Sequence, residues 1–228
     1  MATSLNHTQP TVSAFRWVPD FARGLVRDLR VRWALEEIGR PYRTALLDGD
    51  RPRDDEYRQW QPFGQVPAFD DGELRLFESG AILLYLGVQD ERLLPRELEA
   101  RWRATAWMIA ALNSVEPPIS MLASYDIFNA GKDWAKAARP AALGLIEMRL
   151  RSVSDALAGK DWLAGKFSIA DIMMVTVLRN LRHTEIVGGF ANLADFVERG
   201  EARPAFGRAL AAQAADFETR PSNQKHGG

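Results

Sequence analysis

Residues 64–82 constrain the fold of this chain more than any other stretch. Residues 66–69 have the composition of a short strand, and residues 74–76 alternate like a returning strand. Between them, Asp71-Gly72 predicts a tight hairpin turn, because such a turn needs a positive φ that glycine adopts freely. From Glu78 onward, apolar residues recur at helical spacing. The predicted order is therefore strand, hairpin, strand and helix.

A proline at the start of the first of these strands indicates that the arrangement could bind a ligand. Pro67 cannot donate to a sheet ladder, so it belongs at a strand start or an edge. A cis Val66–Pro67 bond would turn the backbone N–H and C=O of Val66 outward, where they could pair with an extended peptide. The N-terminus of the next helix suits a carboxylate, and the Glu78 carboxylate suits an amino group. Together these groups predict a site for a small zwitterionic peptide.

The same stretch resembles the glutathione-binding half of the glutathione S-transferase superfamily, of cytosolic, bacterial type. A lone Val-Pro pair would fit a hairpin and helix of any α/β protein, but the full spacing from Val66-Pro67 to Glu78-Ser79 is more specific. The resemblance covers about residues 11–217 and implies glutathione as the cosubstrate. The residues that it implies for glutathione binding are Gln65, Val66, Pro67, Glu78 and Ser79.

The expected fold is an α/β thioredoxin-like N-terminal domain followed by an all-α helical domain. Strands at 11–17 and 42–47 flank a helix at 25–38 that ends at Gly39, which predicts a parallel pair with a right-handed crossover. We expect the first domain to occupy residues 11–88, with a linker at 88–94.

The helical domain is expected at residues 95–217, with a break or kink at Pro117-Pro118 and an interruption or bend at Pro140. Ser168 and Asp171 form the signature of a capping box at the start of another helix. The polar residues 218–228 predict a disordered tail.

Composition excludes several functions. The 228 residues carry a formal net charge of −1, with no global field that favours nucleic acid. The sequence has no cysteine, which excludes disulfides and cysteine redox chemistry, and its three histidines are scattered, so we expect no metal site. No apolar run is long enough for a membrane span, and residues 1–10 lack the core of a signal peptide. We expect a soluble cytoplasmic protein.

The usual thiol activator is missing from the expected position. Transferases of this superfamily place a Tyr, Ser or Cys just after the first strand, whereas residues 17–31 contain none of these. Matching the tyrosine-type enzymes puts Phe21 at the tyrosine position, and matching the serine type puts Leu25 or Val26 at the serine position. A free thiol has a pKa of about 8.5, and one charge-assisted hydrogen bond of ~1.5–3 kcal/mol would suffice to ionise it near neutral pH.

The loop offers arginines instead, at positions 23, 27 and 30. In the alpha class of the superfamily, an arginine six residues after the tyrosine lies beside the sulfur, and Arg27 is six residues after Phe21. Arg27 is therefore the residue expected to stabilise the thiolate, with Phe21 and Arg23 completing the set of candidate catalytic residues. Alternatively, Arg27 pairs with a carboxylate such as Asp28 or Glu78, or is solvated.

A pocket for a small hydrophobic electrophile is expected between the two domains. Its candidate lining is Trp17, Phe21, Met108, Met121 and Tyr125, of which Tyr125 offers a substitute hydroxyl donor. These side chains fit a protein core equally well. For Trp60, beside the glutathione site, packing is the favoured role.

Two main interpretations follow from the resemblance. The first is a glutathione transferase of detoxification that conjugates the thiolate to a small hydrophobic electrophile, or has related peroxidase or isomerase activity. The second is a non-catalytic member that binds glutathione or another protein after losing its activator. A third, a structural partner that dimerises, would have no affinity for glutathione. A homodimer is implied by the resemblance alone.

Overall fold

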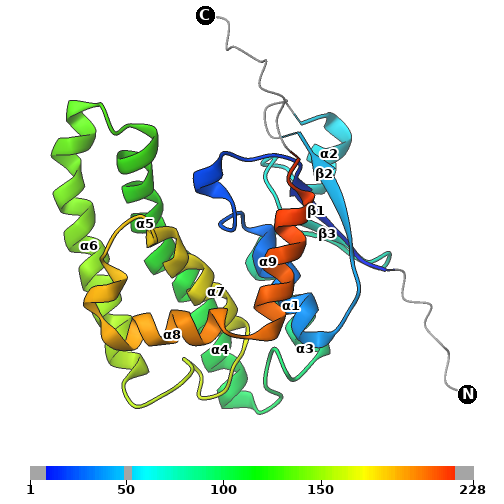
Figure 1. Cartoon of the computed structure of the whole chain (residues 1–228). Coiled ribbons are helices and arrows are strands. Elements are labelled where there is room, and N and C mark those ends of the chain that lie inside the picture. Colours follow the sequence, from blue (N-terminus) through cyan, green and yellow to red (C-terminus); the bar gives the residue numbers. More distant parts are fainter. Residues whose placement is uncertain (1–8, 49–52, 219–228) are drawn as a thin grey trace, which may run out of the picture.

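The structure is a computed structural model, and it describes residues 9–48 and 53–218 (Figure 1). The first part of the chain contributes β1 (Thr11–Phe15), α1 (Asp28–Ile38), β2 (Arg43–Leu47), α2 (Asp55–Trp60), β3 (Ala68–Asp70), β4 (Arg75–Phe77) and α3 (Ser79–Gln89). The remainder is helical and contains α4 (Leu98–Ala110), α5 (Glu116–Ala123), α6 (Asp133–Leu157), α7 (Ile169–Leu178), α8 (Ala191–Glu201) and α9 (Pro204–Asp216).

The four described strands form one mixed sheet in the order β2-β1-β3-β4. Strands β1 and β2 run parallel, with Thr11 opposite Arg43, and the crossover between them is α1. Strand β3 is antiparallel to both β1 and β4. The Val66–Pro67 peptide bond, just before β3, is cis. The predicted thioredoxin-like domain followed by a helical domain is therefore confirmed.

Helix α1 begins three residues later than the sequence predicts. Gly24 has φ +75°, and the next turns close with short i→i+3 bonds, from Leu29 N to Val26 O and from Arg30 N to Arg27 O. These tighter turns keep residues 25–27 out of the α-helix. As a result, Arg27 is the residue that caps α1 rather than a member of its buried stripe.

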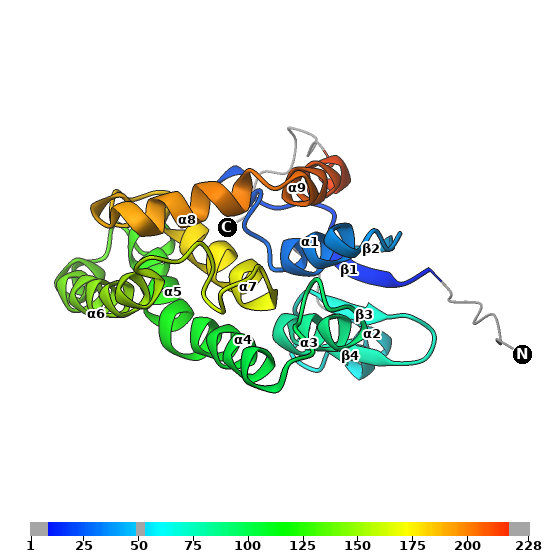
Figure 2. The same ribbon diagram turned by 90° about the horizontal axis from the view of Figure 1, so that it is seen from below.

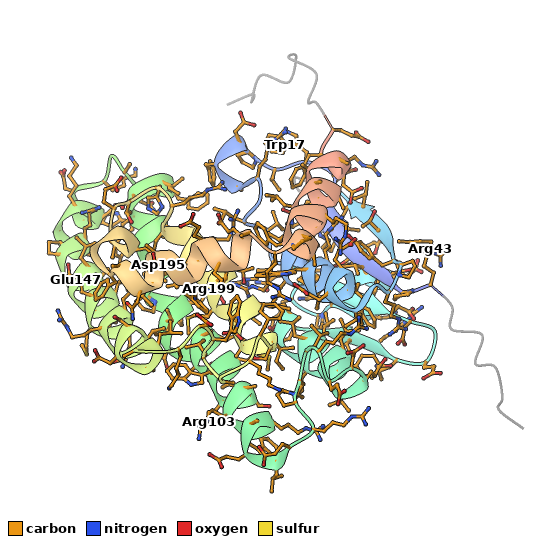
Figure 3. The ribbon with its side chains drawn as sticks, turned by 60° about the horizontal axis from the view of Figure 1, so that its bottom comes forward. Trp17, Arg43, Arg103, Glu147, Asp195 and Arg199 are labelled. Atoms are coloured by element: carbon orange, nitrogen blue, oxygen red, sulfur yellow. The ribbon has the colours of Figure 1, made fainter. Side chains whose placement is uncertain are left out.

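Helices α1 and α3 pack side by side, and both contact α7 of the helical domain (Figure 2). One continuous apolar core joins the two domains. Trp33 of α1 is fully buried, and its ring centroid lies 4.9 Å from that of Phe206 in α9. The C-terminal helix α9 thus returns to pack on the thioredoxin-like domain, beside α1. Charged side chains such as Arg103 of α4 and Glu147 of α6 point outward (Figure 3).

Two π-helical turns lie directly before and directly after α5. Residues Ala111–Val115 link α4 to α5, and Ser124–Phe128 follow α5. The predicted break or kink at Pro117-Pro118 falls where α5 begins, directly after the first π-helical turn: both prolines lie in the first turn of α5. Pro140 was expected to interrupt or bend its helix; α6 continues through it over 25 residues, so the interruption does not occur and the bend stays a prediction.

The predicted capping box at the start of α7 is confirmed. The Asp171 carboxylate accepts hydrogen bonds from the backbone amides of Ser168 and Leu163, both at 2.9 Å. Glu218, expected to begin a disordered tail, is anchored: its amide donates to Arg16 O at 2.9 Å, and its carboxylate pairs with the Arg16 guanidinium. The rest of that predicted tail lies outside the described residues. No helix in the described ranges is both long and apolar enough to cross a membrane.

Candidate functional site

A cavity of about 440 Å³ opens where the two domains meet, and most of its lining is polar. We call it the polar cavity. Its lining consists of Arg27, Arg30, Gln61, Gln65, Val66, Pro67, Glu78, Ser79, Leu112, Asn113, Glu116, Pro117 and Ser120. The structure thus brings together all five residues that the sequence assigned to glutathione binding, and it adds Arg27 to them.

The loop before β3 is held in place by hydrogen bonds of the Tyr57 and Ser13 hydroxyl groups. The Tyr57 hydroxyl donates to the carbonyl of Gln65 at 2.6 Å, and it lies 2.8 Å from the Ser13 Oγ. Because the carbonyl can only accept, the Tyr57 proton points to Gln65, and Ser13 donates to Tyr57 in turn. The Ser13 Oγ also accepts from the Ala68 amide at 2.7 Å. These bonds fix the loop on both sides of the cis peptide bond.

The backbone of Val66 forms no hydrogen bond to any residue that the structure describes, although the residue is 6% exposed. Buried backbone groups are normally paired, so an unpaired N–H and C=O beside a cavity are available to a ligand. Glu78 lines the same cavity with φ +66°, a conformation that costs a non-glycine residue about 1–3 kcal/mol. Such strain is typical of functional sites.

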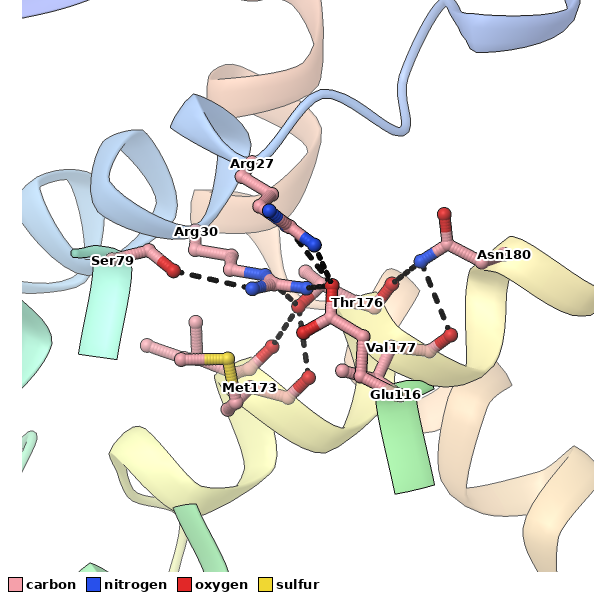
Figure 4. Close-up of polar contacts among 9 residues, drawn as sticks. Arg27, Arg30, Ser79, Glu116, Met173, Thr176, Val177 and Asn180 are labelled. Carbon is pink, nitrogen blue, oxygen red and sulfur yellow. Dashed lines mark hydrogen bonds and ion pairs between the residues drawn. The ribbon is translucent and has the colours of Figure 1, made fainter. Parts of the chain in front are cut away.

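Arg30 is the central cation of the site. Its side chain is buried, and each guanidinium nitrogen donates to a different element: Nε to Thr176 Oγ1 of α7 at 3.1 Å, one terminal nitrogen to Ser79 Oγ of α3 at 3.1 Å, and the other to Glu116 Oε1 of α5 at 3.0 Å (Figure 4). Burial lowers the pKa of Arg30 from its ordinary value, and the Glu116 carboxylate offsets part of that effect. Arg30 therefore joins three elements around the cavity.

Arg27 shares the same carboxylate. Its Nε and one terminal nitrogen both lie 3.0 Å from Glu116 Oε1, and its side chain is 45% exposed (Figure 4). Burial alone would raise the pKa of Glu116, but the charges of Arg30 and Arg27 hold it below its ordinary value. With Arg27 and Arg30 charged, this cluster of two arginines and one carboxylate carries a net charge of +1.

A second cavity, of about 530 Å³ and mainly apolar, lies next to the first. We call it the apolar cavity, and its lining is Phe21, Ala22, Leu25, Val26, Ala123, Ile127, Phe128, Asn180, Arg182 and His183. The two cavities flank the same backbone, because Leu25 and Val26 line one and Arg27 lines the other. Both also border α5, at Ser120 and at Ala123.

The candidate catalytic residues are therefore divided between locations. Arg27 lines the polar cavity, whereas Phe21 lines the apolar cavity, with its ring 5.5 Å from that of Phe128. Arg23 lines neither: it pairs with Asp20 at 3.1 Å, and its guanidinium lies over the Phe217 ring. The carboxylate that pairs with Arg27 is Glu116, not the Asp28 or Glu78 weighed from the sequence.

Most of the other residues expected to line the electrophile pocket lie elsewhere. Met108 is buried in the core, Met121 is exposed, and the Tyr125 ring packs against Trp134. Trp17, in the loop after β1, is likewise outside the lining of the apolar cavity (Figure 3). The Trp60 indole donates to Phe69 O at 3.0 Å, which agrees with the packing role favoured from the sequence.

Two arginines that follow α7 hold the loop between the cavities. One terminal nitrogen of Arg182 donates to the carbonyls of Phe21 and Arg23, both at 2.8 Å, and Arg179 donates to Gly24 O at 3.3 Å. Burial lowers the pKa of Arg179 to about 10. The helical domain thus fixes the conformation of the loop at residues 21–24.

Sequence reasoning missed Glu116, Thr176 and the central position of Arg30. A glutamate directly before two prolines is a recognisable helix start, but its pairing with α1 depends on the docking of the two domains. The described residues contain no cluster of three or more His, Asp or Glu suited to a metal ion. His7 and His226 lie outside the described residues.

Comparison with known proteins agrees with the fold. Residues 22–87 match the model of the glutathione S-transferase N-terminal domain, and residues 122–211 match that of the C-terminal domain. The chain is 29% identical over 209 residues to glutathione S-transferase 4 of Zea mays, an alignment that covers 86% of this chain and 90% of the relative. It is 31% identical to glutathione S-transferase F10 of Arabidopsis thaliana, over 60% of this chain and 68% of that one.

Solved structures agree as well. A glutathione transferase from Burkholderia graminis, crystallised with two glutathione molecules bound per subunit, superposes with a TM-score of 0.80 at 27% identity, over 90% of this chain and 88% of that one. A family member from Pseudomonas fluorescens with two bound glutathione molecules gives a TM-score of 0.80 at 25% identity, over 91% and 95% of the two chains. The chain belongs to the glutathione S-transferase family.

Proposed function

We propose that this protein binds glutathione in the polar cavity and transfers its thiolate to a small hydrophobic electrophile held in the apolar cavity. The observation that carries the proposal is the grouping of an unpaired Val66 backbone, the Glu78-Ser79 helix start and the Arg27 cation around one cavity. An extended peptide needs a backbone partner, and its charged ends need an anion site and a carboxylate. Glutathione has each of these groups.

Arg27 is the proposed activator of the thiol. The cluster of Arg27, Arg30 and Glu116 has one positive charge in excess, which favours an anion over a neutral thiol nearby. Arg27 is half-exposed at the border between the cavities, so its guanidinium is accessible to a sulfur there. A cationic neighbour is an established means of lowering a thiol pKa.

The apolar cavity is the proposed electrophile site. Seven of its ten lining side chains are apolar, and it adjoins the polar cavity along residues 25–27. In the conjugation of a chlorinated nitrobenzene, the sulfur would form a bond to the aromatic carbon and chloride would leave. Reduction of an organic hydroperoxide at the expense of the same thiolate is a second use of this geometry.

An ultraviolet titration of protein-bound glutathione tests the role of Arg27. In the wild type we expect a bound-thiol pKa about 1.5–2 units below the free value of about 8.5. Arg27→Ala should raise that pKa by roughly one unit or more and lower turnover about tenfold at neutral pH. Arg23→Ala, the same change at an arginine outside the polar cavity, should alter neither. Turnover and thiol pKa that survive Arg27→Ala unchanged would contradict the assignment.

Binding without turnover, against both the chlorinated nitrobenzene and cumene hydroperoxide, would support the non-catalytic interpretation that the missing hydroxyl motivates. No binding of glutathione by the wild type would contradict the proposed function and favour a protein-interaction or structural role. Isothermal titration calorimetry separates these outcomes, because it measures affinity independently of turnover.

The proposal includes a homodimer, a cytoplasmic location and a role in detoxification. Exposed apolar side chains support the dimer: Leu98, Trp102 and Ile109 share one face of α4, and Phe77 stacks edge-on with Phe63 near β4. Exposed apolar residues grouped in this way are typical of protein interfaces. Multi-angle light scattering should give twice the monomer mass for the wild type and the monomer mass for a Trp102→Glu variant.

A further inference from the structure

The two hydroxyl groups bound to Arg30 differ in one respect. A guanidinium has no acceptor, so both Ser79 Oγ and Thr176 Oγ1 must accept from it. Thr176 then donates its own proton to the backbone of its helix, with Ile172 O at 2.8 Å and Met173 O at 2.9 Å (Figure 4). The Ser79 hydroxyl has no acceptor for its proton among the described residues. The hydroxyl proton of Thr176 is therefore already used in hydrogen bonds, whereas the hydroxyl proton of Ser79 is still available to donate.

This retained donor belongs to a buried group at the wall of a cavity. Ser79 is 4% exposed and lines the polar cavity. Buried polar groups are normally satisfied, so a hydroxyl proton left over here indicates an acceptor on a ligand. Because one lone pair of Ser79 is taken by a buried cation, the hydroxyl is polarised toward donation. The nearby charge of Arg30 also disfavours a cationic ligand group at this position.

Ser79 also begins α3, an 11-residue helix whose first intrahelical bond runs from Ile82 N to Glu78 O. The amides of the first turn are therefore free of intrahelical acceptors and favour an anion. The hydroxyl donor and the helix N-terminus lie at the same residue. Both favour a carboxylate.

We propose that Arg30 is a positioning residue for carboxylate recognition: it holds the Ser79 hydroxyl as a donor to the α-carboxylate of the γ-glutamyl end of glutathione. This is the carboxylate that shares a carbon with an amino group, and Glu78, the neighbour of Ser79 in the cavity, suits that amino group. This inference rests on the proposed function, since it takes glutathione as the ligand of the polar cavity. It adds a buried residue with no direct contact to the peptide. The planar guanidinium of arginine matters here, because the ammonium group of lysine cannot reach three acceptors on three elements in one plane.

Glutathione and its γ-aminobutyryl analogue, which lacks the α-carboxylate alone, separate this role from a merely structural one. Calorimetry would measure both ligands with the wild type, Ser79→Ala and Arg30→Lys. We expect each variant to lose about tenfold or more in affinity for glutathione, the worth of a hydrogen bond to a charged group. Their affinity for the analogue should change by less than about twofold, because the carboxylate that Ser79 binds is absent.

Arg32→Lys is the matched control. Arg32 is on the same helix and 1% exposed, but it pairs with Asp28 and Asp216 and does not line the cavity. We expect it to leave both affinities unchanged. If Arg30→Lys does not fold, the double variant Arg30→Met/Glu116→Gln removes both buried charges together and is compared with Glu116→Gln on the same two ligands.

Equal losses for both ligands in the Arg30 variants, or no loss for either, would overturn the proposal without contradicting the binding of glutathione by the wild type. A Ser79→Ala variant that binds glutathione as well as the wild type does would overturn it too. Failure of the wild-type protein to bind glutathione is a different result, because it contradicts the proposed function itself.

Discussion

The Oε1 atom of Glu116 lies 3.0 Å from Arg27 Nε, and this contact joins the start of α5 to the residue that caps α1. The same oxygen lies 3.0 Å from a nitrogen of Arg30. One carboxylate oxygen thus neutralises part of the charge of two cations across the border between the domains. Glu116 stabilises the docked domains, but it also weakens the positive field that an anionic sulfur would experience.

Replacing Glu116 by glutamine should therefore lower the pKa of bound glutathione. The amide oxygen keeps an acceptor for both arginines, while one negative charge is lost. A unit charge several ångströms away, at an effective dielectric constant of about 40, is worth ~1 kcal/mol, or roughly one pKa unit. The ultraviolet thiolate titration measures the shift, with Glu147→Gln on the exposed face of α6 as control. A thiol pKa that rises would mean that the carboxylate mainly orients Arg27.

The same residue should make the protein sensitive to acid. The pKa of Glu116 in the folded protein lies below its ordinary value of 4.5, because the two arginines overcome the effect of burial. A carboxyl group whose folded pKa is lowered contributes stability above the unfolded value and loses it as the pH falls through the folded value. The loss attributable to Glu116 should therefore begin below about pH 4.5.

Urea unfolding of the wild type and Glu116→Gln, measured at pH 7 and at steps down to about pH 3, tests this linkage. At pH 7 we expect the wild type to be more stable by about 1–3 kcal/mol, since the variant leaves a buried arginine without its counter-charge. The gap should narrow as the pH falls. A gap that is constant with pH would show that Glu116 is not titrating in this range.

The capping box of α7 should be a major source of stability. In Asp171→Ala, the buried amides of Leu163 and Ser168 lose their acceptor. Each unsatisfied buried donor costs about 1–3 kcal/mol, so we expect a loss of about 2–5 kcal/mol in the free energy of unfolding. Asp171→Asn keeps one acceptor oxygen and should lose less. Asp195→Ala, at an exposed position of α8 (Figure 3), should change stability by less than about 0.5 kcal/mol.

Much of the fold was predictable because its signals are local. The hairpin at Asp71-Gly72, the cis-prolyl bond and the capping box at Ser168 each depend on residues close together in the sequence. Helix boundaries were less accurate where tertiary contacts intervene. The start of α1 is delayed because Arg179 and Arg182 hold the preceding loop, and these residues follow it by more than 150 positions.

The residues of the candidate site were likewise predictable where they are close together in the sequence, and not where tertiary contacts bring them together. One local stretch of the sequence supplies five of the site residues, and the structure places all of them at a single cavity: Gln65, Val66, Pro67, Glu78 and Ser79. The partner of Arg27 could not be predicted, because Glu116 approaches it only after the helical domain docks. Phe21 does line the apolar cavity, as expected for the electrophile pocket, but it lies apart from Arg27, with which the sequence grouped it as a candidate catalytic residue.

Arg182 should control the affinity for the electrophile. In Arg182→Ala the carbonyls of Phe21 and Arg23 lose their donor, and the loop that lines the apolar cavity is less fixed. Two hydrogen bonds with net values of about 0.5–1.5 kcal/mol each together amount to about 1–3 kcal/mol, so the KM for the electrophile should rise by about fivefold or more. The Kd of glutathione should be unchanged. Arg199→Ala, which removes a bond to Asp161 O far from both cavities, is the control.

An unchanged KM for the electrophile in Arg182→Ala, or an equal loss for both substrates, would contradict this assignment. The first result would mean that the loop keeps its conformation without the arginine. The second would indicate that the loop supports the whole border between the domains rather than the apolar cavity.

Phe21→Tyr tests whether the activator can be restored at the tyrosine position. The Phe21 ring lies in the apolar cavity, 5.5 Å from that of Phe128, whereas the proposed sulfur partner Arg27 lines the polar cavity. A hydroxyl added to this ring should therefore leave the pKa of bound glutathione unchanged within about 0.3 units, since a hydrogen bond that is not formed shifts nothing. The KM for an apolar electrophile should rise about twofold to tenfold, because the new hydroxyl is desolvated by the ligand. A thiol pKa lowered by a unit or more in Phe21→Tyr would mean that the loop brings residue 21 to the sulfur when glutathione binds, and Arg27 would then have a competitor for its role.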